Sequence, residues 1–181
     1  LFATHWDRLL MCIGIVVRST SSNYIILYMP TYAIKELHLP QMLGFIATLV
    51  GGILLTIGAP YFGHLSDKIG RLRMMVVVSI LFALSAYPAF VLLVAHPSLA
   101  GIVGIVCWLS LLKAAYSGVL PALMSELFPT ATRSTGIALA YNISVPIFGG
   151  FAPLIASWLI AVTHSPLAPS FYLIGTSVLS L

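Results

Sequence analysis

Long apolar runs separated by short polar segments occupy the whole chain. A membrane-spanning helix needs about 20 mostly apolar residues, and the runs lie at about 9–34, 41–62, 74–95, 99–124, 134–162 and 170–181. The runs are continuous rather than alternating, which excludes the strands of a membrane barrel, and helices are the default spans in lipid. The pattern predicts an all-α membrane protein of six helices whose last helix is truncated.

Composition supports a membrane protein. The chain has 181 residues, of which 60% are hydrophobic and 7% are charged, whereas an ordinary soluble domain has about 25% charged residues. Twelve charged side chains cannot cover a soluble surface of this size. The small excess of basic over acidic residues therefore indicates no nucleic-acid partner, and the position of each basic residue along the chain matters more.

The polar connections fall into two groups, because successive spans alternate their direction. One group holds five cations and the other holds only Lys35; the five are Arg8, Lys68, Arg71, Arg73 and Arg133. Basic residues concentrate in cytoplasmic loops. We therefore expect residues 1–8, 63–73 and 125–133 to lie on the cytoplasmic side of the membrane.

Two further cations lie inside the apolar runs. Arg18 is about ten residues into the first span and Lys113 about ten residues before the end of the fourth, so each lies roughly 15 Å from the cytoplasmic face. A charge at that depth costs at least about 2.5–3.5 kcal/mol, and the chain has no acidic residue at mid-span to pair with it. A polar cavity, an anionic ligand or a structural ion pair with a residue outside this chain would each compensate the charge.

Helical spacing places polar residues beside both cations. Side chains three or four positions apart share one face of a helix. The neighbours on these faces are Ser21 and Ser22 beside Arg18, followed by Asn23 and Tyr28, and Ser110 and Ser117 beside Lys113. The predicted substrate contacts are Arg18, Lys113, Ser22, Ser117, Tyr28 and Asn142, although a buried Tyr or Asn in a bundle also commonly bonds a neighbouring helix.

The segment GHLSDKIGRLR at 63–73 resembles the loop motif G-x-L-x-D-[RK]-x-G-[RK]-[RK] of the major facilitator superfamily. The matching residues are Gly63, Leu65, Asp67, Lys68, Gly70 and Arg71. Leu72 departs from the motif where a basic residue is expected, and Arg73 follows directly. The resemblance implies a conformational latch that joins two halves of a transporter, made of Gly63, Asp67, Lys68, Gly70, Arg71 and Arg73.

A second resemblance covers nearly the whole chain. The segments 28–32 (YMPTY), 120–150 and 152–160 are similar to the carboxy-terminal half of the metabolite:proton symporter family. The resemblance implies six of the twelve helices of a transporter in the bacterial inner membrane, with residues 1–8 as the end of its central cytoplasmic loop. The amino-terminal six-helix half would then be a partner that this chain lacks.

The family resemblance also indicates the cargo. In this fold the first helix of each three-helix repeat lines the central cavity, and Arg18 and Lys113 lie in two such helices. Two cavity cations favour a di- or tricarboxylate such as citrate or oxoglutarate over zwitterionic proline or betaine. The expected activity is secondary active transport by alternating access, with a proton as the coupling ion. No acid or His lies at mid-span, so either the coupling carboxylate lies in the absent half or the protein is not a proton symporter.

The remaining polar and helix-breaking residues have structural interpretations. Glu126 and Arg133 flank the connection between the fourth and fifth spans, where we expect a cytoplasmic salt bridge. Prolines and glycines interrupt three spans, either as hinges for transport or as packing kinks; they are Pro30, Pro121, Pro146, Gly149, Gly150 and Pro153. Cys12 and Cys107 lie inside apolar runs, so they indicate neither a disulfide framework nor a zinc site. We expect no metal and no cofactor other than the coupling proton.

Several other functions fit the sequence to different degrees. An intramembrane serine protease fails because Ala115 stands where the motif needs Gly beside Ser117, and no span carries a mid-depth His as base. A drug or metabolite exporter working as an antiporter, and a proline/betaine-type symporter, would share the 63–73 motif. A half that transports nothing by itself is the remaining alternative.

Overall fold

The computed structural model describes residues 6–180, so the start of the predicted 1–8 loop and the last residue of the predicted 170–181 span lie outside the described part. Four long helices come first and are followed by shorter segments. They are α1 (Trp6–Lys35), α2 (Gln41–Ile69), α3 (Arg71–Ala95), α4 (Leu99–Leu127), α5 (Arg133–Ser144), the π-helix η1 (Val145–Gly150), α6 (Ala152–Thr163) and α7 (Ala168–Leu179).

The predicted fold class is confirmed. The described residues contain helices and no strand. Helices α1 to α4 and the combined segment Arg133–Thr163 are each long and apolar enough to cross a membrane, whereas α7 has 12 residues. The chain is therefore an integral membrane protein whose six helical segments follow the six apolar runs.

The segment 63–73 is not the loop that its polarity predicted. Helix α2 continues through Ile69 and α3 begins at Arg71, so Gly70 alone separates them. Gly70 has a φ of 103°, a backbone conformation that favours glycine. The charged side chains of this segment thus project from two helix ends, because a helix satisfies its own backbone hydrogen bonds whether its surroundings are polar or apolar.

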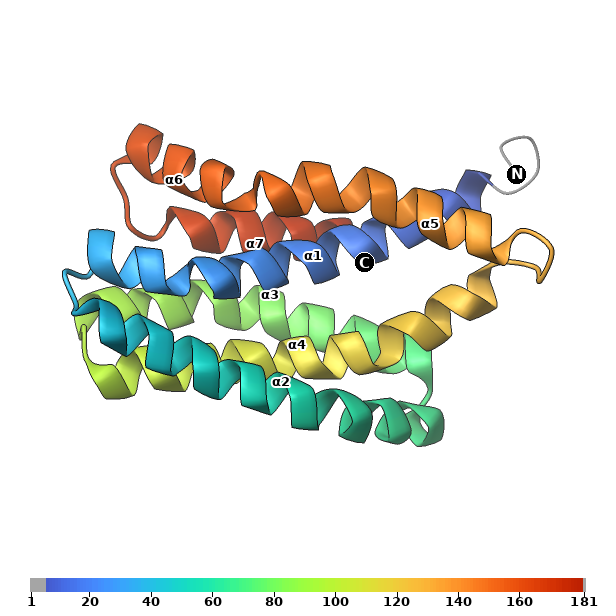
Figure 1. The fold of residues 1–181 in the computed structure, drawn as a ribbon, viewed down its shortest axis with the longest axis horizontal. Coiled ribbons are helices and arrows are strands. Elements are labelled where there is room, and N and C mark those ends of the chain that lie inside the picture. The colour runs from blue at the N-terminus through green and yellow to red at the C-terminus, as the bar shows by residue number, and fades with distance from the viewer. Residues whose placement is uncertain (1–5, 181) are drawn as a thin grey trace.

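The helices form an elongated bundle with their axes roughly aligned (Figure 1). The start of α1, the turn between α2 and α3 and the connection between α4 and α5 lie at one end of the bundle. The connections α1–α2, α3–α4 and α6–α7 lie at the other end. This alternation is the one that the distribution of basic residues predicts.

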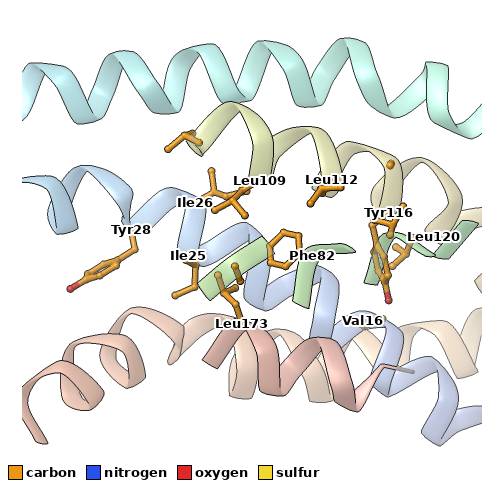
Figure 2. Close-up of a cluster of buried hydrophobic side chains, with 14 of the residues drawn as sticks. Val16, Ile25, Ile26, Tyr28, Phe82, Leu109, Leu112, Tyr116, Leu120 and Leu173 are labelled. Carbon is orange, nitrogen blue, oxygen red and sulfur yellow. The ribbon is translucent and has the colours of Figure 1, made fainter. Parts of the chain in front are cut away.

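Helix α1 is the centre of the bundle. It packs against α2, α4, α5, η1, α6 and α7, and Figure 2 shows apolar side chains of α3, α4 and α7 gathered around it. In contrast, α2 presents large apolar side chains to the outside, including Met42, Leu49 and Ile57. Exposed apolar surface of this extent fits lipid or a further membrane helix.

Helices α2 and α4 approach each other through small residues. The facing pairs are Gly51 with Ser110, Gly58 with Ala114 and Gly63 with Gly118. An added Cβ at Gly51 would lie 2.6 Å from the Ser110 hydroxyl oxygen, and one at Gly63 would lie 3.1 Å from the Gly118 carbonyl oxygen. Small residues at such spacings let membrane helices pack closely. Ser110 is therefore part of this interface and not, as predicted, of a polar stripe around Lys113.

The fifth span changes its helical type halfway. It runs as α5, then as the π-helix η1, then as α6. Pro146 lies at the start of η1 and Pro153 at the start of α6, and Pro disturbs regular α-helical hydrogen bonding because it has no N–H. Pro30 and Pro121, in contrast, lie within α1 and α4, which remain α-helical around them.

Candidate functional site

Lys113 is the cation that the structure brings to a polar pocket. Its ammonium nitrogen donates to the carbonyl oxygen of Ser19 at 2.5 Å and to the Ser19 hydroxyl at 2.7 Å. These two bonds join α4 to α1. Because Ser19 directly follows Arg18, Lys113 lies at about the same height in the bundle as Arg18. The ion pairs of residues 6–180 all involve Arg71, so no carboxylate in that part of the chain neutralises Lys113.

The pocket beside Lys113 is small, and its lining is about half polar and half apolar. It has a volume of about 270 Å³ and is lined by Ser19, Thr20, Asn23, Tyr24, Lys113 and Val145. Hydroxyl, amide and ammonium groups from α1 and α4 therefore converge on one space, closed on a third side by η1. Such a set of donors suits a ligand that carries hydrogen-bond acceptors and negative charge.

The glycine in η1 lets this wall approach α1. An added Cβ at Gly149 would lie 2.7 Å from the Tyr24 ring and would also overlap the Thr20 methyl group. The η1 backbone thus rests directly on two of the pocket residues. A side chain at Gly149 would push them into the pocket or push η1 away.

The carbonyl group of Phe148 fixes η1 between α1 and α7. Five residues later, where a π-helix would supply the donor, Pro153 has no N–H. The carbonyl oxygen instead accepts from the Tyr172 hydroxyl at 2.6 Å and from the Ser21 hydroxyl at 3.4 Å. Ser21 and Tyr172 are themselves 3.1 Å apart. These polar contacts hold the wall of the pocket in place.

Arg18 does not line this pocket, contrary to the prediction that it faces a cavity. Its side chain is completely buried, and its guanidinium carbon lies 4.0 Å from the centre of the Phe82 ring and 4.7 Å from that of Tyr116. Figure 2 shows these rings on α3 and α4. One guanidinium nitrogen, Nη1, donates to the Ser22 hydroxyl at 3.0 Å. Nε and Nη2 have no hydrogen-bond partner among the described residues.

The other predicted contacts lie outside the pocket. Ser22 bonds Arg18 and its own helix backbone, and Tyr28 pairs with the Ser157 hydroxyl at 2.9 Å. Ser117 is half-buried on α4, and Asn142 is exposed on α5. Their contact with a substrate stays a prediction.

Sequence reasoning missed Ser19, Thr20 and Tyr24. It counted three and four residues onward from Arg18, which identifies the face that Arg18 itself occupies. The pocket lies on the adjacent face of α1, the one toward Lys113. The unbroken polar run at 18–23 was the available signal, because such a run gives every direction around the helix a polar residue.

A charge cluster joins three helices at the end of the bundle that holds the α2–α3 turn. Arg71 donates to the Asp67 carboxylate at 2.8 Å and also pairs with Glu126, linking α2, α3 and α4. The expected salt bridge between Glu126 and Arg133 is therefore wrong in its basic partner. Glu126 lies on α4, which packs against α2 and α3, whereas Arg133 begins α5, which packs mainly on α1.

The other residues of the predicted latch lie around this cluster. Gly63 contacts α4 closely, and Gly70 forms the turn. Lys68 and Arg73 are exposed beside them. The cluster thus ties together one end of this chain's own helices, and a role as a latch between two halves of a transporter stays a prediction.

Comparison with known proteins identifies the family. The family model described as Major Facilitator Superfamily matches residues 11–181. The glycine betaine/proline/ectoine/pipecolic acid transporter OusA of Dickeya dadantii (strain 3937) is 32% identical, over 98% of this chain and 35% of its own length. The citrate-proton symporter of Klebsiella pneumoniae is 29% identical, over 99% of this chain and 41% of its own length. The proline/betaine transporter of Salmonella typhimurium is 33% identical, over 98% of this chain and 35% of its own length.

The chain therefore spans 35 to 41% of the length of these relatives. No solved structure matches it. The family match covers nearly every residue, including the spans and the 63–73 motif, and the relatives named are transporters or symporters. The chain belongs to the Major Facilitator Superfamily.

Proposed function

We propose that this chain forms one half of a secondary transporter that carries a small carboxylate-bearing metabolite, with a di- or tricarboxylate such as citrate or oxoglutarate as the favoured cargo. The observation that carries the proposal is the Lys113 ammonium group at the polar pocket, bonded to Ser19 and to no carboxylate of the described chain. A buried cation of this kind is costly unless an anion compensates it.

The lining residues suit a carboxylate. Lys113 offers a point charge with three donors, of which Ser19 takes two in this structure. The hydroxyl groups of Ser19 and Thr20 and the amide of Asn23 add neutral donors along one side of α1. A carboxylate oxygen accepting from Lys113 would form a charge-assisted hydrogen bond, which is about twice as strong as a neutral one.

A second six-helix half is required to enclose the cargo. The pocket is open on one side, and family members are built from two halves that rock around a central site. We propose that the missing amino-terminal half covers it, and that the two halves expose the site alternately to each face of the membrane. By the distribution of basic residues, 1–8, 63–73 and 125–133 face the cytoplasm, and the bacterial organisms of the relatives support an inner-membrane location.

Proton symport is part of the proposal. The name of the Klebsiella pneumoniae relative includes a proton as co-substrate. The acidic residues of the described chain lie at or near helix ends, at Asp7, Glu36, Asp67 and Glu126, and none lines the pocket. We therefore assign the coupling carboxylate to the second half.

A zwitterionic cargo is the second candidate. Two of the relatives carry proline or betaine in their names, and these compounds also contain a carboxylate for Lys113. The Tyr24 ring at the pocket could receive their cationic group by a cation–π interaction. The two candidates differ in the charge of the cargo, because a zwitterion brings no net negative charge to Lys113.

Uptake into proteoliposomes tests the proposal. The complete transporter is reconstituted and offered labelled citrate, oxoglutarate, proline and betaine, with and without an inward proton gradient. We expect gradient-stimulated uptake of the two carboxylates, lost in Lys113→Met and retained in the control Lys35→Met, which removes an exposed cation at the far end of α1. Uptake of proline and betaine alone would establish the second candidate, and unchanged uptake by Lys113→Met would refute the site.

A further inference from the structure

Besides Lys113, the bundle interior holds a second cation, Arg18, which does not line the pocket. It is completely buried, and the ion pairs of residues 6–180 do not include it. A guanidinium group cannot be deprotonated in proteins, so the charge persists in this interior. Its one hydrogen bond, to the Ser22 hydroxyl, leaves Nε and Nη2 without partners in the described chain. A group other than an acidic side chain of residues 6–180 must therefore compensate this charge.

The aromatic rings hold Arg18 in position. Phe82 and Tyr116 lie 4.0 Å and 4.7 Å from its guanidinium carbon, and ring faces attract cations. The Tyr116 hydroxyl is anchored in turn, because it donates to the Ile15 carbonyl oxygen at 3.1 Å. This enclosure fixes the charge and separates it from the pocket, so that the guanidinium has no direct path to a substrate at Lys113.

The two cations are nevertheless neighbours. Lys113 bonds Ser19, which directly follows Arg18 in α1, so the two cationic side chains meet the same short stretch of that helix. Both cationic side chains are buried, so water and salt screen the repulsion between them only weakly. The pocket therefore lies in the field of two positive charges, although only one of them is accessible.

We infer that Arg18 determines the charge preference of the pocket through its field, without touching the substrate. The inference rests on the proposed function and assigns its charge selectivity to one residue. Lys113 binds one carboxylate group directly, and Arg18 favours a ligand that carries a second negative charge over one that does not. Arg18 is thus a specificity-determining residue whose contribution depends on its charge and not on a contact.

The expected effect follows from Coulomb's law. At an effective dielectric constant of about 20, a unit charge on the order of 10 Å away changes the affinity for one additional negative charge by roughly tenfold. Removing the charge of Arg18 should therefore reduce the preference for a dianion over a monoanion of the same size by roughly tenfold. Binding of the carboxylate group common to both ligands should change less.

A matched ligand pair tests the inference on the unmodified complete transporter. Succinate and its half-amide succinamate have the same carbon skeleton and differ by one negative charge near neutral pH. Inhibition constants against uptake of a labelled carboxylate are measured for both. We expect succinate to inhibit at a concentration at least about tenfold lower. Equal constants would overturn the inference without any variant having to fold.

Variants assign the preference to Arg18. Arg18→Met removes the charge and keeps a long side chain that packs well against rings, and Arg18→Lys restores a charge at the same position. The control Phe82→Leu loosens the enclosure and keeps the charge. We expect the succinate preference to fall roughly tenfold in Arg18→Met only, and to recover in Arg18→Lys. If the affinities for succinate and succinamate fall by the same factor in Arg18→Met, the role of Arg18 is structural and the inference is overturned.

The same experiment separates the two proposals. If Lys113→Met abolishes uptake while the succinate preference is unchanged in Arg18→Met, the proposed site stands and the role of Arg18 is refuted. If the unmodified transporter takes up neither labelled citrate nor labelled oxoglutarate, the carboxylate function itself fails. Should Arg18→Met not insert, Arg18→Gln takes its place, and the ligand pair on the unmodified protein still decides.

Discussion

Two helix contacts on opposite sides of the bundle are built in different ways. Helices α2 and α4 meet through small residues whose backbones nearly touch, as at Gly63 and Gly118. Helix α1 meets η1 and α7 through polar bonds, as at Ser21, Phe148 and Tyr172. The first contact leaves no space for adjustment, whereas the second contains a π-helix and exchangeable hydrogen bonds. The polar pocket adjoins the second contact.

The difference indicates that one part of the chain is rigid and another part can adjust. Close backbone packing makes a pair of helices move as one body, since dispersion contacts act over very short distances. A π-helix whose carbonyl group is bonded by side chains from two other helices can change partners at lower cost. We therefore expect α2 and α4 to form the rigid part of this half, and the segment around η1 to adjust when the pocket fills.

The largest effect is expected at the small-residue contact. In Gly118→Val the added atoms would overlap the Ala59 carbonyl oxygen and lie near the Gly63 amide nitrogen, which are backbone atoms and cannot turn aside. We expect a loss of at least about 3 kcal/mol in stability, measured by thermal unfolding in detergent. Gly104→Val on the same helix has no neighbour within 4 Å and should change stability by less than about 0.5 kcal/mol. Equal losses would show that backbone contact does not distinguish the two glycines.

A smaller loss of stability and a clear loss of transport are expected at η1. A side chain in Gly149→Val would press on Thr20 and Tyr24, which can move, so we expect a destabilisation of about 1–2 kcal/mol. The rate of uptake per correctly folded transporter should also fall, because both displaced residues line the pocket. The matched control is Gly150→Val, which has open space around it. If the uptake rate per folded transporter is the same in Gly149→Val and Gly150→Val, η1 is not linked to the pocket.

The hydrogen bond that secures η1 should contribute a still smaller amount. Tyr172→Phe removes the donor at 2.6 Å from the Phe148 carbonyl oxygen, while the Ser21 hydroxyl remains nearby. We expect a loss of about 1 kcal/mol in thermal unfolding. Tyr87→Phe serves as the control, because the Tyr87 hydroxyl makes no hydrogen bond within residues 6–180. A loss as small as that of the control would mean that Ser21 alone secures the carbonyl group.

The smallest effect on stability is expected at the charge cluster. Glu126→Gln removes one of the two partners of Arg71 at an exposed position, where ion pairs contribute little and salt screens them. The melting temperature should change less than in Tyr172→Phe, and raising the salt concentration should diminish the difference further. A large and salt-independent loss would show that the cluster is more than a surface link between α2, α3 and α4.

The spans could be predicted from sequence because the membrane sets a length and a polarity that few other structures satisfy. The ends of the spans could not. The charge of segment 63–73 predicts a loop, but its backbone stays helical on both sides of Gly70. Polarity reports where a helix leaves the membrane core, and it does not report where the helix ends.

The position of Arg18 and Lys113 near the middle of their helices was also predictable, since it follows from counting residues along each apolar run. Which way each side chain points was not. Arg18 faces Phe82 and Tyr116, and Ser110 faces Gly51, because the rotation of each helix depends on which neighbours it packs against. The basic partner of Glu126 was wrong for the same reason: it depends on the packing of α4 beside α2 and α3.

Equilibrium binding to the purified complete transporter tests the central claim most directly. The affinity for a labelled dicarboxylate is measured in detergent for the unmodified protein, for Lys113→Met and for Lys35→Met. Losing a charge-assisted bond to a buried cation should weaken binding by about 100-fold or more in Lys113→Met, with no change in Lys35→Met. Equal affinities in all three proteins would contradict the proposal that Lys113 binds the carboxylate of the substrate.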